Sequence, residues 1–168
     1  MVRHVVLVGL MGTGKTTVGR SLAEALDRPF SDSDAAIERE RGSTVQELAD
    51  QIGVEEMHEL EARHLLRALD ASEPSVIAAA ASTIDDAACR AALVAPGVTT
   101  IWLKADPAVL ARRFERQRHR PRFGRSPREL LAEQATERDA LFESLHPIEI
   151  ETTAKEPAEI VRLALDAL

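Results

Sequence analysis

The sequence predicts an α/β protein with a five-stranded parallel sheet and helices on both of its faces. Short apolar runs alternate along the chain with segments in which apolar residues recur at helical spacing. A glycine-rich turn joins the first apolar run to the first helical segment. The chain has 168 residues and is 45% hydrophobic, so we expect residues 1–168 to form one domain with a sizeable core.

Five runs are expected to be the strands of this sheet. They are residues 5–8, 28–31, 75–78, 98–103 and 148–151. Proline, glycine and capping residues mark the ends of the expected helices. One helix follows the glycine-rich turn, and others are expected between 34 and 42, over 43–70 with a break near Gly53, and over 84–94. Three more should begin at 107, 127 and 157. Because ligands bind beyond the carboxyl ends of parallel strands, the loops at that edge should form one crevice.

The glycine-rich turn itself, Gly9–Thr16, fits G-x-x-x-x-G-K-[ST], the phosphate-binding P-loop. It lies between an apolar strand and a helix, which is the context that the motif requires. Glycine permits the backbone dihedrals that turn N–H groups inward, at the positive end of a helix. Lys15 adds a cation for the outer phosphates, and Thr16 adds a hydroxyl for Mg²⁺. A glycine turn that binds nothing would not need these two side chains.

Two aspartates, Asp32 and Asp34, follow the second expected strand. If the strand continued through both, their side chains would share a face. One could then serve the Mg²⁺ shell while the other met a hydroxyl to be phosphorylated, a reaction that depends mainly on positioning and charge neutralisation. The alternative is an Asx turn, or the N-cap of the next helix.

The net charge of −7 argues against a general nucleic-acid binder, and we expect no nucleic-acid partner. One segment is basic, however, with eight arginines and one acid between Arg112 and Arg128. It indicates a local anion partner, or else a solvated helix face. A single cysteine, no long apolar run and a strand at the very start predict a cytoplasmic protein without a membrane or signal segment.

Together, these residues resemble the shikimate kinase family over nearly the whole chain. The matching pieces are 9–20, 30–34, Ile37-Glu38, Gly42, Glu61, Arg120-Pro121 and Arg138. The resemblance implies a P-loop kinase fold, Mg²⁺ and ATP as cofactors, and shikimate as the small-molecule hydroxyl acceptor. It further implies an acceptor-binding helical region near 33–61 and a lid near 113–125. We expect a monomer.

The resemblance also implies a role for each matched residue. ATP would contact Gly12, Thr13, Gly14, Lys15, Thr16, Thr17, Arg113 and Pro157. Thr16 and Asp32 would hold Mg²⁺. Lys15, Asp34 and Arg120 would be catalytic, with Asp34 holding the acceptor hydroxyl and Arg120 reaching the phosphates. The acceptor would meet Asp34, His58, Ala80 and Arg138, with Arg138 pairing with its carboxylate.

Departures from the family pattern fall on the acceptor side. The family has three glycines where this chain has Ala79–Ala81, an arginine at His58, and two pocket phenylalanines at Ala49 and Met57. A neutral histidine cannot form the two-pronged contact of an arginine with a carboxylate. Three interpretations stay open: a shikimate kinase, a related kinase for another polyol, cyclitol or hydroxy acid, and a nucleotide-binding protein without catalysis. A nucleoside monophosphate kinase fits less well, since Asp32 and Asp34 suit a hydroxyl acceptor.

Overall fold

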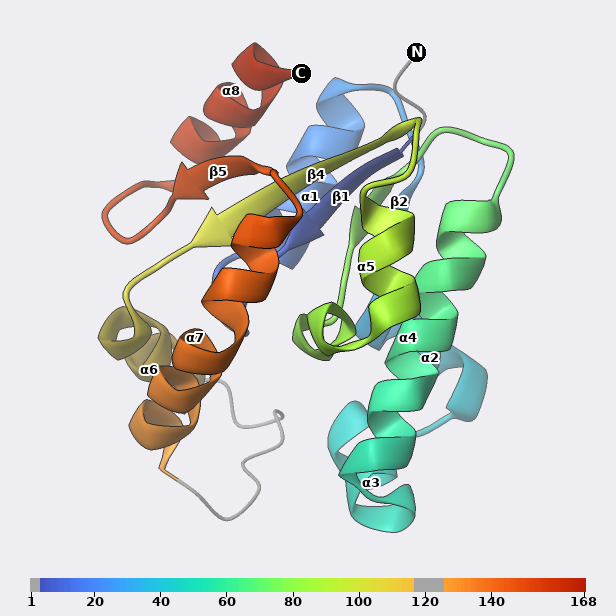
Figure 1. Ribbon diagram of the computed structural model, residues 1–168, viewed down its shortest axis with the longest axis vertical. Coiled ribbons are helices and arrows are strands. Elements are labelled where there is room, and N and C mark those ends of the chain that lie inside the picture. Colours follow the sequence, from blue (N-terminus) through green and yellow to red (C-terminus); the bar gives the residue numbers. More distant parts are fainter. Residues whose placement is uncertain (1–3, 117–125) are drawn as a thin grey trace.

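A central parallel sheet organises the protein, as shown by a computed structural model that describes residues 4–116 and 126–168 (Figure 1). The strands are β1 His4–Val8, β2 Phe30–Asp32, β3 Val76–Ala78, β4 Val98–Lys104 and β5 Ile148–Glu151. They lie in the order β2-β3-β1-β4-β5, and each adjacent pair is parallel. The predicted fold class is confirmed.

Helices cover both faces of the sheet (Figure 1). Their bounds are α1 Lys15–Ala25, α2 Ser33–Arg41, α3 Val45–Ile52, α4 Val54–Asp70, α5 Ala87–Leu93, α6 Pro107–Glu115, α7 Pro127–Ser144 and α8 Pro157–Ala167. Apolar residues of α1 and α8 pack on one face, and those of α4, α5, α6 and α7 pack on the other. Strand β1 is therefore buried along its whole length, which explains its unbroken apolar sequence.

Capping residues fix several helix starts where the sequence predicts them. Asp106 and Ser126 accept hydrogen bonds from Ala108 N and Glu129 N, ahead of the prolines that begin α6 and α7. The stretch 84–94 differs from the prediction, because it divides into a 3-10 helix, η1 Ala81–Asp85, and the short helix α5. Asp86 separates the two, since its side chain accepts from Cys89 N and starts a new helix.

A small apolar cluster holds α2, α3 and α4 together beyond the main core. Its buried members are Ile37, Val45, Leu48, Ala49 and Met57. These helices form the region 33–61 that the sequence predicts to bind the acceptor. Ala49 packs inside this cluster, where it is 7% exposed.

An aromatic pair ties α7 to the sheet. Trp102 of β4 and Phe142 of α7 are stacked, with ring centroids 5.3 Å apart. Both side chains are buried, and the ammonium of Lys104 lies 4.6 Å from the centre of a Trp102 ring. The pair fixes the position of α7, the helix that carries Arg138. Within the described ranges, no helix combines the length and apolar character needed to cross a membrane.

Candidate active site

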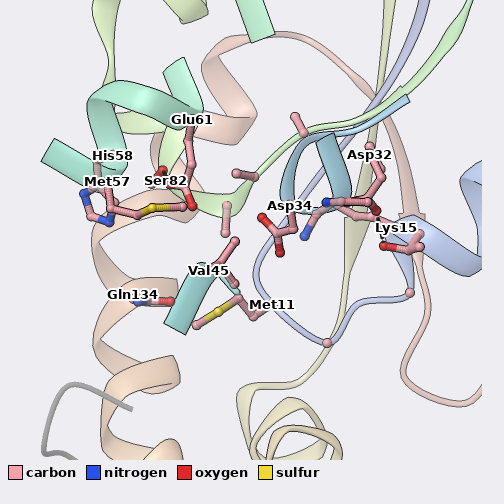
Figure 2. A pocket seen from close by; sticks show the side chains of 18 of the residues that line it. Met11, Lys15, Asp32, Asp34, Val45, Met57, His58, Glu61, Ser82 and Gln134 are labelled. Carbon is pink, nitrogen blue, oxygen red and sulfur yellow. Dashed lines mark hydrogen bonds between the residues drawn. The ribbon is translucent and has the colours of Figure 1, made fainter. Parts of the chain in front are cut away.

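A cavity of about 620 Å³ opens beside the P-loop. Its wall comprises the loop and the start of α1 on one side, and residues of α2, α4, η1 and α7 on the other. Figure 2 shows Lys15 and Asp32 at one end, and His58, Glu61 and Ser82 at the other. We call these ends the nucleotide half and the acceptor half.

The P-loop backbone is formed by glycines in conformations that other residues rarely adopt. Gly12 and Gly14 have φ of 83° and 95°. Gly9 has φ of 142°, and a Cβ there would lie 2.5 Å from the carbonyl oxygen of Leu103. Helix α1 follows Gly14 directly, without a side-chain cap. Its first N–H groups are therefore left to a ligand, at the positive end of the helix dipole.

Lys15 lies back over this loop. Its ammonium donates hydrogen bonds to the carbonyl oxygens of Gly9 and Leu10, at 2.8 and 2.9 Å. The hydroxyl of Thr13 donates to the same Leu10 oxygen. The lysine thus stands at the rim of the phosphate cradle, as the motif predicts. Thr17, in the first turn of α1, also lines the cavity.

Thr16 and Asp32 come together at the foot of the loop. The Thr16 hydroxyl donates to one oxygen of the Asp32 carboxylate at 2.5 Å, and the other oxygen accepts from Ala35 N at 3.2 Å. Asp32 is thus the N-cap of α2, as the alternative interpretation predicts, and its side chain also meets the P-loop hydroxyl. One carboxylate beside one hydroxyl is a donor set that fits Mg²⁺, which usually keeps several waters and phosphate oxygens.

Asp34 reaches the cavity by a route that the sequence did not predict. The strand ends at Asp32, and α2 begins at Ser33, so the two aspartates do not share a strand face. The premise of a continuing strand is wrong, because Asp32 caps a helix at once. Asp34 stands in the first turn of α2 and lines the cavity (Figure 2).

Arg113 of α6 packs against the nucleotide half. Its guanidinium donates to the carbonyl oxygen of Gly12 at 3.1 Å and lies 3.5 Å from that of Thr152. It therefore links the P-loop to the segment that joins β5 to α8, and α8 begins at Pro157. Arg120 and most of the expected lid fall within 117–125, outside the described residues.

Glu61 dominates the electrostatics of the acceptor half. The Ser82 hydroxyl donates to its carboxylate, and Figure 2 shows the two side chains meeting. Burial, more than any other cause, raises the pKa of Glu61 to about 7, and the negative charge of Asp34 acts in the same direction. The carboxyl group is thus divided between its neutral and charged forms near neutral pH.

His58 lies one turn before Glu61 on α4 and lines the cavity. Burial lowers its pKa below the ordinary value, and the positive charge of Arg138 lowers it further. The imidazole is therefore neutral at pH 7, whereas the arginine that the family has at this position would be charged. It can offer one hydrogen bond but no charge.

Arg138 of α7 lines the same half and is 7% exposed. Its Nε lies 3.1 and 3.0 Å from the two carboxylate oxygens of Asp85, and its Nη2 lies 2.6 Å from one of them. No sequence pattern predicts this ion pair, because Asp85 stands in a different element, 53 residues away.

The alanines that replace glycines are accommodated without strain. Ala80 has φ of −60° and ψ of 145°, an ordinary extended conformation. Among the described residues, positive φ outside glycine is confined to Asp27 and His146. Ala79–Ala81 therefore lack the positive φ that would require glycine, and all three line the cavity.

Comparison with known proteins identifies the family. The sequence matches the family model described as shikimate kinase over residues 11–168. This chain belongs to the shikimate kinase family. Enzymes of this family are phosphotransferases that use ATP with Mg²⁺ and an alcohol acceptor.

Individual shikimate kinases are similar over most of their length. The protein of Zymomonas mobilis is 38% identical over 167 residues, which cover 99% of this chain and 93% of that protein. The protein of Brucella canis is 42% identical over 139 residues, or 82% of this chain and 68% of that protein. The solved shikimate kinase of Acinetobacter baumannii, in complex with shikimate, matches with a TM-score of 0.92 at 29% identity, covering 99% and 93% of the two chains.

Proposed function

We propose that this protein transfers the γ-phosphate of ATP to a hydroxyl of shikimate. One observation carries the proposal beyond the family resemblance. A single cavity of about 620 Å³ contains the P-loop with Lys15 at one end and the buried cation Arg138 at the other. Asp34 lines the same cavity. ATP and an acid acceptor can thus meet in one cavity.

The nucleotide half would bind ATP through backbone N–H groups of residues 12–17 and the ammonium of Lys15. Thr16 and Asp32 would hold Mg²⁺, whose charge offsets that of the phosphates when the ion is bound. Arg113 would stiffen the loop from the side, because it donates to Gly12 O. In this arrangement the protein contributes position and positive charge, which are what phosphoryl transfer needs.

The acceptor half would hold shikimate between α2, α4 and α7. Asp34 would accept a hydrogen bond from the reacting hydroxyl and orient its oxygen toward the phosphate. Arg138 would approach the carboxylate, while neutral His58 and the backbone at Ala80 would contact the ring. The helical region 33–61 would supply much of this wall.

Some sequence predictions remain predictions. A lid over 113–125 and a phosphate contact from Arg120 depend largely on residues outside the described ranges. Slower protease cleavage within 113–125 in the presence of an ATP analogue and shikimate would support the lid. We also propose a monomer located in the cytoplasm, to be tested by sedimentation and by localisation of the tagged protein.

The function is tested by ATP turnover with purified protein and shikimate, followed by detection of phosphorylated shikimate. Asp34→Asn should lower kcat by roughly 10²–10⁴-fold, the usual effect of losing a positioned acid or base. Asp50→Asn is the matched control, because Asp50 is an exposed residue of α3 that accepts from Gln46. If only a different polyol or hydroxy acid is phosphorylated, that compound replaces shikimate as the acceptor. ATP binding without any transfer would indicate a non-catalytic protein.

A further inference from the structure

The cation of the acceptor half is already paired within the protein. Asp85 takes the side of the Arg138 guanidinium formed by Nε and Nη2, with the shortest separation at 2.6 Å. This is one of the two-pronged approaches by which arginine binds a carboxylate. An acceptor carboxylate that approached the same edge would have to displace Asp85.

The backbone around Asp85 holds its carboxylate in this place. Arg90 donates to the carbonyl oxygens of Ile84 and Asp85, at 2.7 and 2.9 Å. The next residue, Asp86, caps α5. The Asp85 side chain itself is 45% exposed, whereas that of Arg138 is 8% exposed. A carboxylate fixed by its backbone thus reaches inward to a nearly buried cation.

Positive charge is otherwise scarce in this half. Asp34 and Glu61 line it, and His58 is neutral at pH 7. The remaining basic residues described on the cavity wall, Lys15, Arg113 and Arg116, belong to the P-loop helix and to α6 or its C-cap. An acidic acceptor therefore enters a region whose described charges are balanced or negative.

A neutral hydrogen-bonding group stands beside the pair. Gln134 lies one turn before Arg138 on α7 and lines the cavity (Figure 2). Its side-chain oxygen is buried and has no hydrogen-bond partner among the described residues. A buried amide oxygen without a partner is costly, so a ligand hydroxyl that donates to it would relieve that cost.

We propose that Asp85 and Gln134 set the acceptor selectivity: Asp85 neutralises Arg138, and Gln134 accepts a hydrogen bond from a ring hydroxyl. The cavity then takes an uncharged polyhydroxylated ring nearly as well as the carboxylate-bearing one. The inference rests on the proposed function, since it assumes that the acceptor occupies this half. It makes Asp85 a competitor of the acceptor carboxylate.

The test compares shikimate with its carboxamide, which has the same shape without the charge. In the wild type, kcat/KM for the two acceptors should differ by less than about tenfold. Asp85→Asn should lower KM for shikimate by roughly three- to tenfold, with kcat and the KM for the carboxamide unchanged. Asp86→Asn is the matched control, because it removes the neighbouring charge and keeps a capping side chain.

Gln134→Leu separates the two parts of the proposal. It should raise KM for both acceptors alike, by roughly three- to tenfold, because both carry the ring hydroxyls. An unchanged KM for both acceptors would remove Gln134 from the proposal. If Asp85→Asn leaves the ratio of kcat/KM for the two acceptors unchanged, the proposed role of Asp85 is wrong. Equal changes of KM for both acceptors would overturn it as well.

Binding measurements keep the inference separate from the proposed function. Calorimetry with shikimate or its carboxamide, in the presence of ADP, requires no phosphate transfer. If neither acceptor is phosphorylated, the proposed function fails. The selectivity proposal then stands or falls on whether Asp85→Asn tightens shikimate binding alone.

Discussion

The nucleotide half of the cavity takes most of its polar groups from one continuous segment, Gly9–Thr16, with Asp32 and Arg113 added from β2 and α6, whereas the acceptor half assembles its polar groups from α2, α4, η1 and α7. In the first, the backbone conformation supplies the N–H groups that a phosphate meets. In the second, side chains face the ligand, and several already have partners in the protein, as in the pairs Glu61–Ser82 and Arg138–Asp85. A ligand of the acceptor half must therefore compete with contacts that the fold itself makes.

The largest expected effect lies in the nucleotide half. Lys15→Ala should lower kcat/KM for ATP by roughly 10²–10³-fold, since it removes the cation that we propose to stabilise the transferring phosphate. Shikimate binding, measured by calorimetry, should change little, and the melting temperature without ligands should stay near that of the wild type. Lys104→Ala is the control, because its ammonium pairs with Glu149 and lies over Trp102. Unchanged ATP affinity and turnover in Lys15→Ala would remove the P-loop assignment.

A second effect should appear in the pH dependence of stability. The pKa of Glu61 is about 7 in the folded protein, above its ordinary value of 4.5. The native state therefore holds its proton more tightly, and this contribution is fully present below about pH 4.5 and is lost as the pH rises through about 7. The loss amounts to at most about 3 kcal/mol in the free energy of unfolding.

Urea denaturation of the wild type and Glu61→Gln at about pH 5 and about pH 8.5 measures this loss. The difference between the two proteins isolates Glu61 from His58 and His64, whose lowered pKa values act in the opposite direction. Glu59→Gln, an exposed position on the same helix, should follow the wild type. Identical pH profiles for Glu61→Gln and the wild type would mean that Glu61 is ionised across this range.

A third, smaller effect tests the missing charge at His58. His58→Arg should lower KM for shikimate by roughly three- to tenfold, because it adds a cation where the imidazole is neutral. Repulsion from Arg138 limits the gain, and Glu61 stands one turn away as a partner. His58→Gln, which is also neutral, should leave KM unchanged. Tight shikimate binding by the wild type that His58→Ala does not affect would place His58 outside the acceptor site.

The smallest effect concerns the backbone at Ala80, in the acceptor half. Ala80→Gly restores the residue typical of the family and should lower the free energy of unfolding by about 0.4–1 kcal/mol, through the greater freedom of the unfolded chain. The opposite change in the nucleotide half, Gly9→Ala, should be far more damaging, since the new Cβ would lie 2.5 Å from Leu103 O. Denaturant unfolding compares the two. Equal losses would contradict the distinction between the halves.

The same distinction explains what could be predicted from the sequence. Gly12, Gly14, Lys15 and Thr16 lie within one turn of chain, so a local motif was sufficient to predict their place at the junction of β1 and α1. Helix starts at Asp106 and Ser126 also followed from local capping patterns. The expected strand face shared by Asp32 and Asp34 is wrong, because the Asp32 side chain caps α2 and the strand ends two residues before Asp34.

Long-range pairing in the acceptor half lies beyond such reasoning. The Asp85–Arg138 ion pair joins residues 53 positions apart, and only the packing of η1 against α7 brings them together. Likewise, the raised pKa of Glu61 comes first from its burial and then from the negative charge of Asp34, and a single sequence reveals neither effect. Sequence reasoning could identify residues that depart from the family pattern there, but not the partners that the protein provides for them.

The stacking of Trp102 on Phe142 also gives the protein a built-in optical reporter. Trp102 is the single tryptophan of the chain, and there is no tyrosine, so nearly all of the intrinsic fluorescence comes from one buried indole. Its stacking partner is on α7, one turn beyond Arg138. A ligand that displaces α7 will alter the indole environment and change the emission spectrum. For ligands of the acceptor half that displace α7, occupancy can therefore be followed in real time, without a label and before any phosphate is transferred.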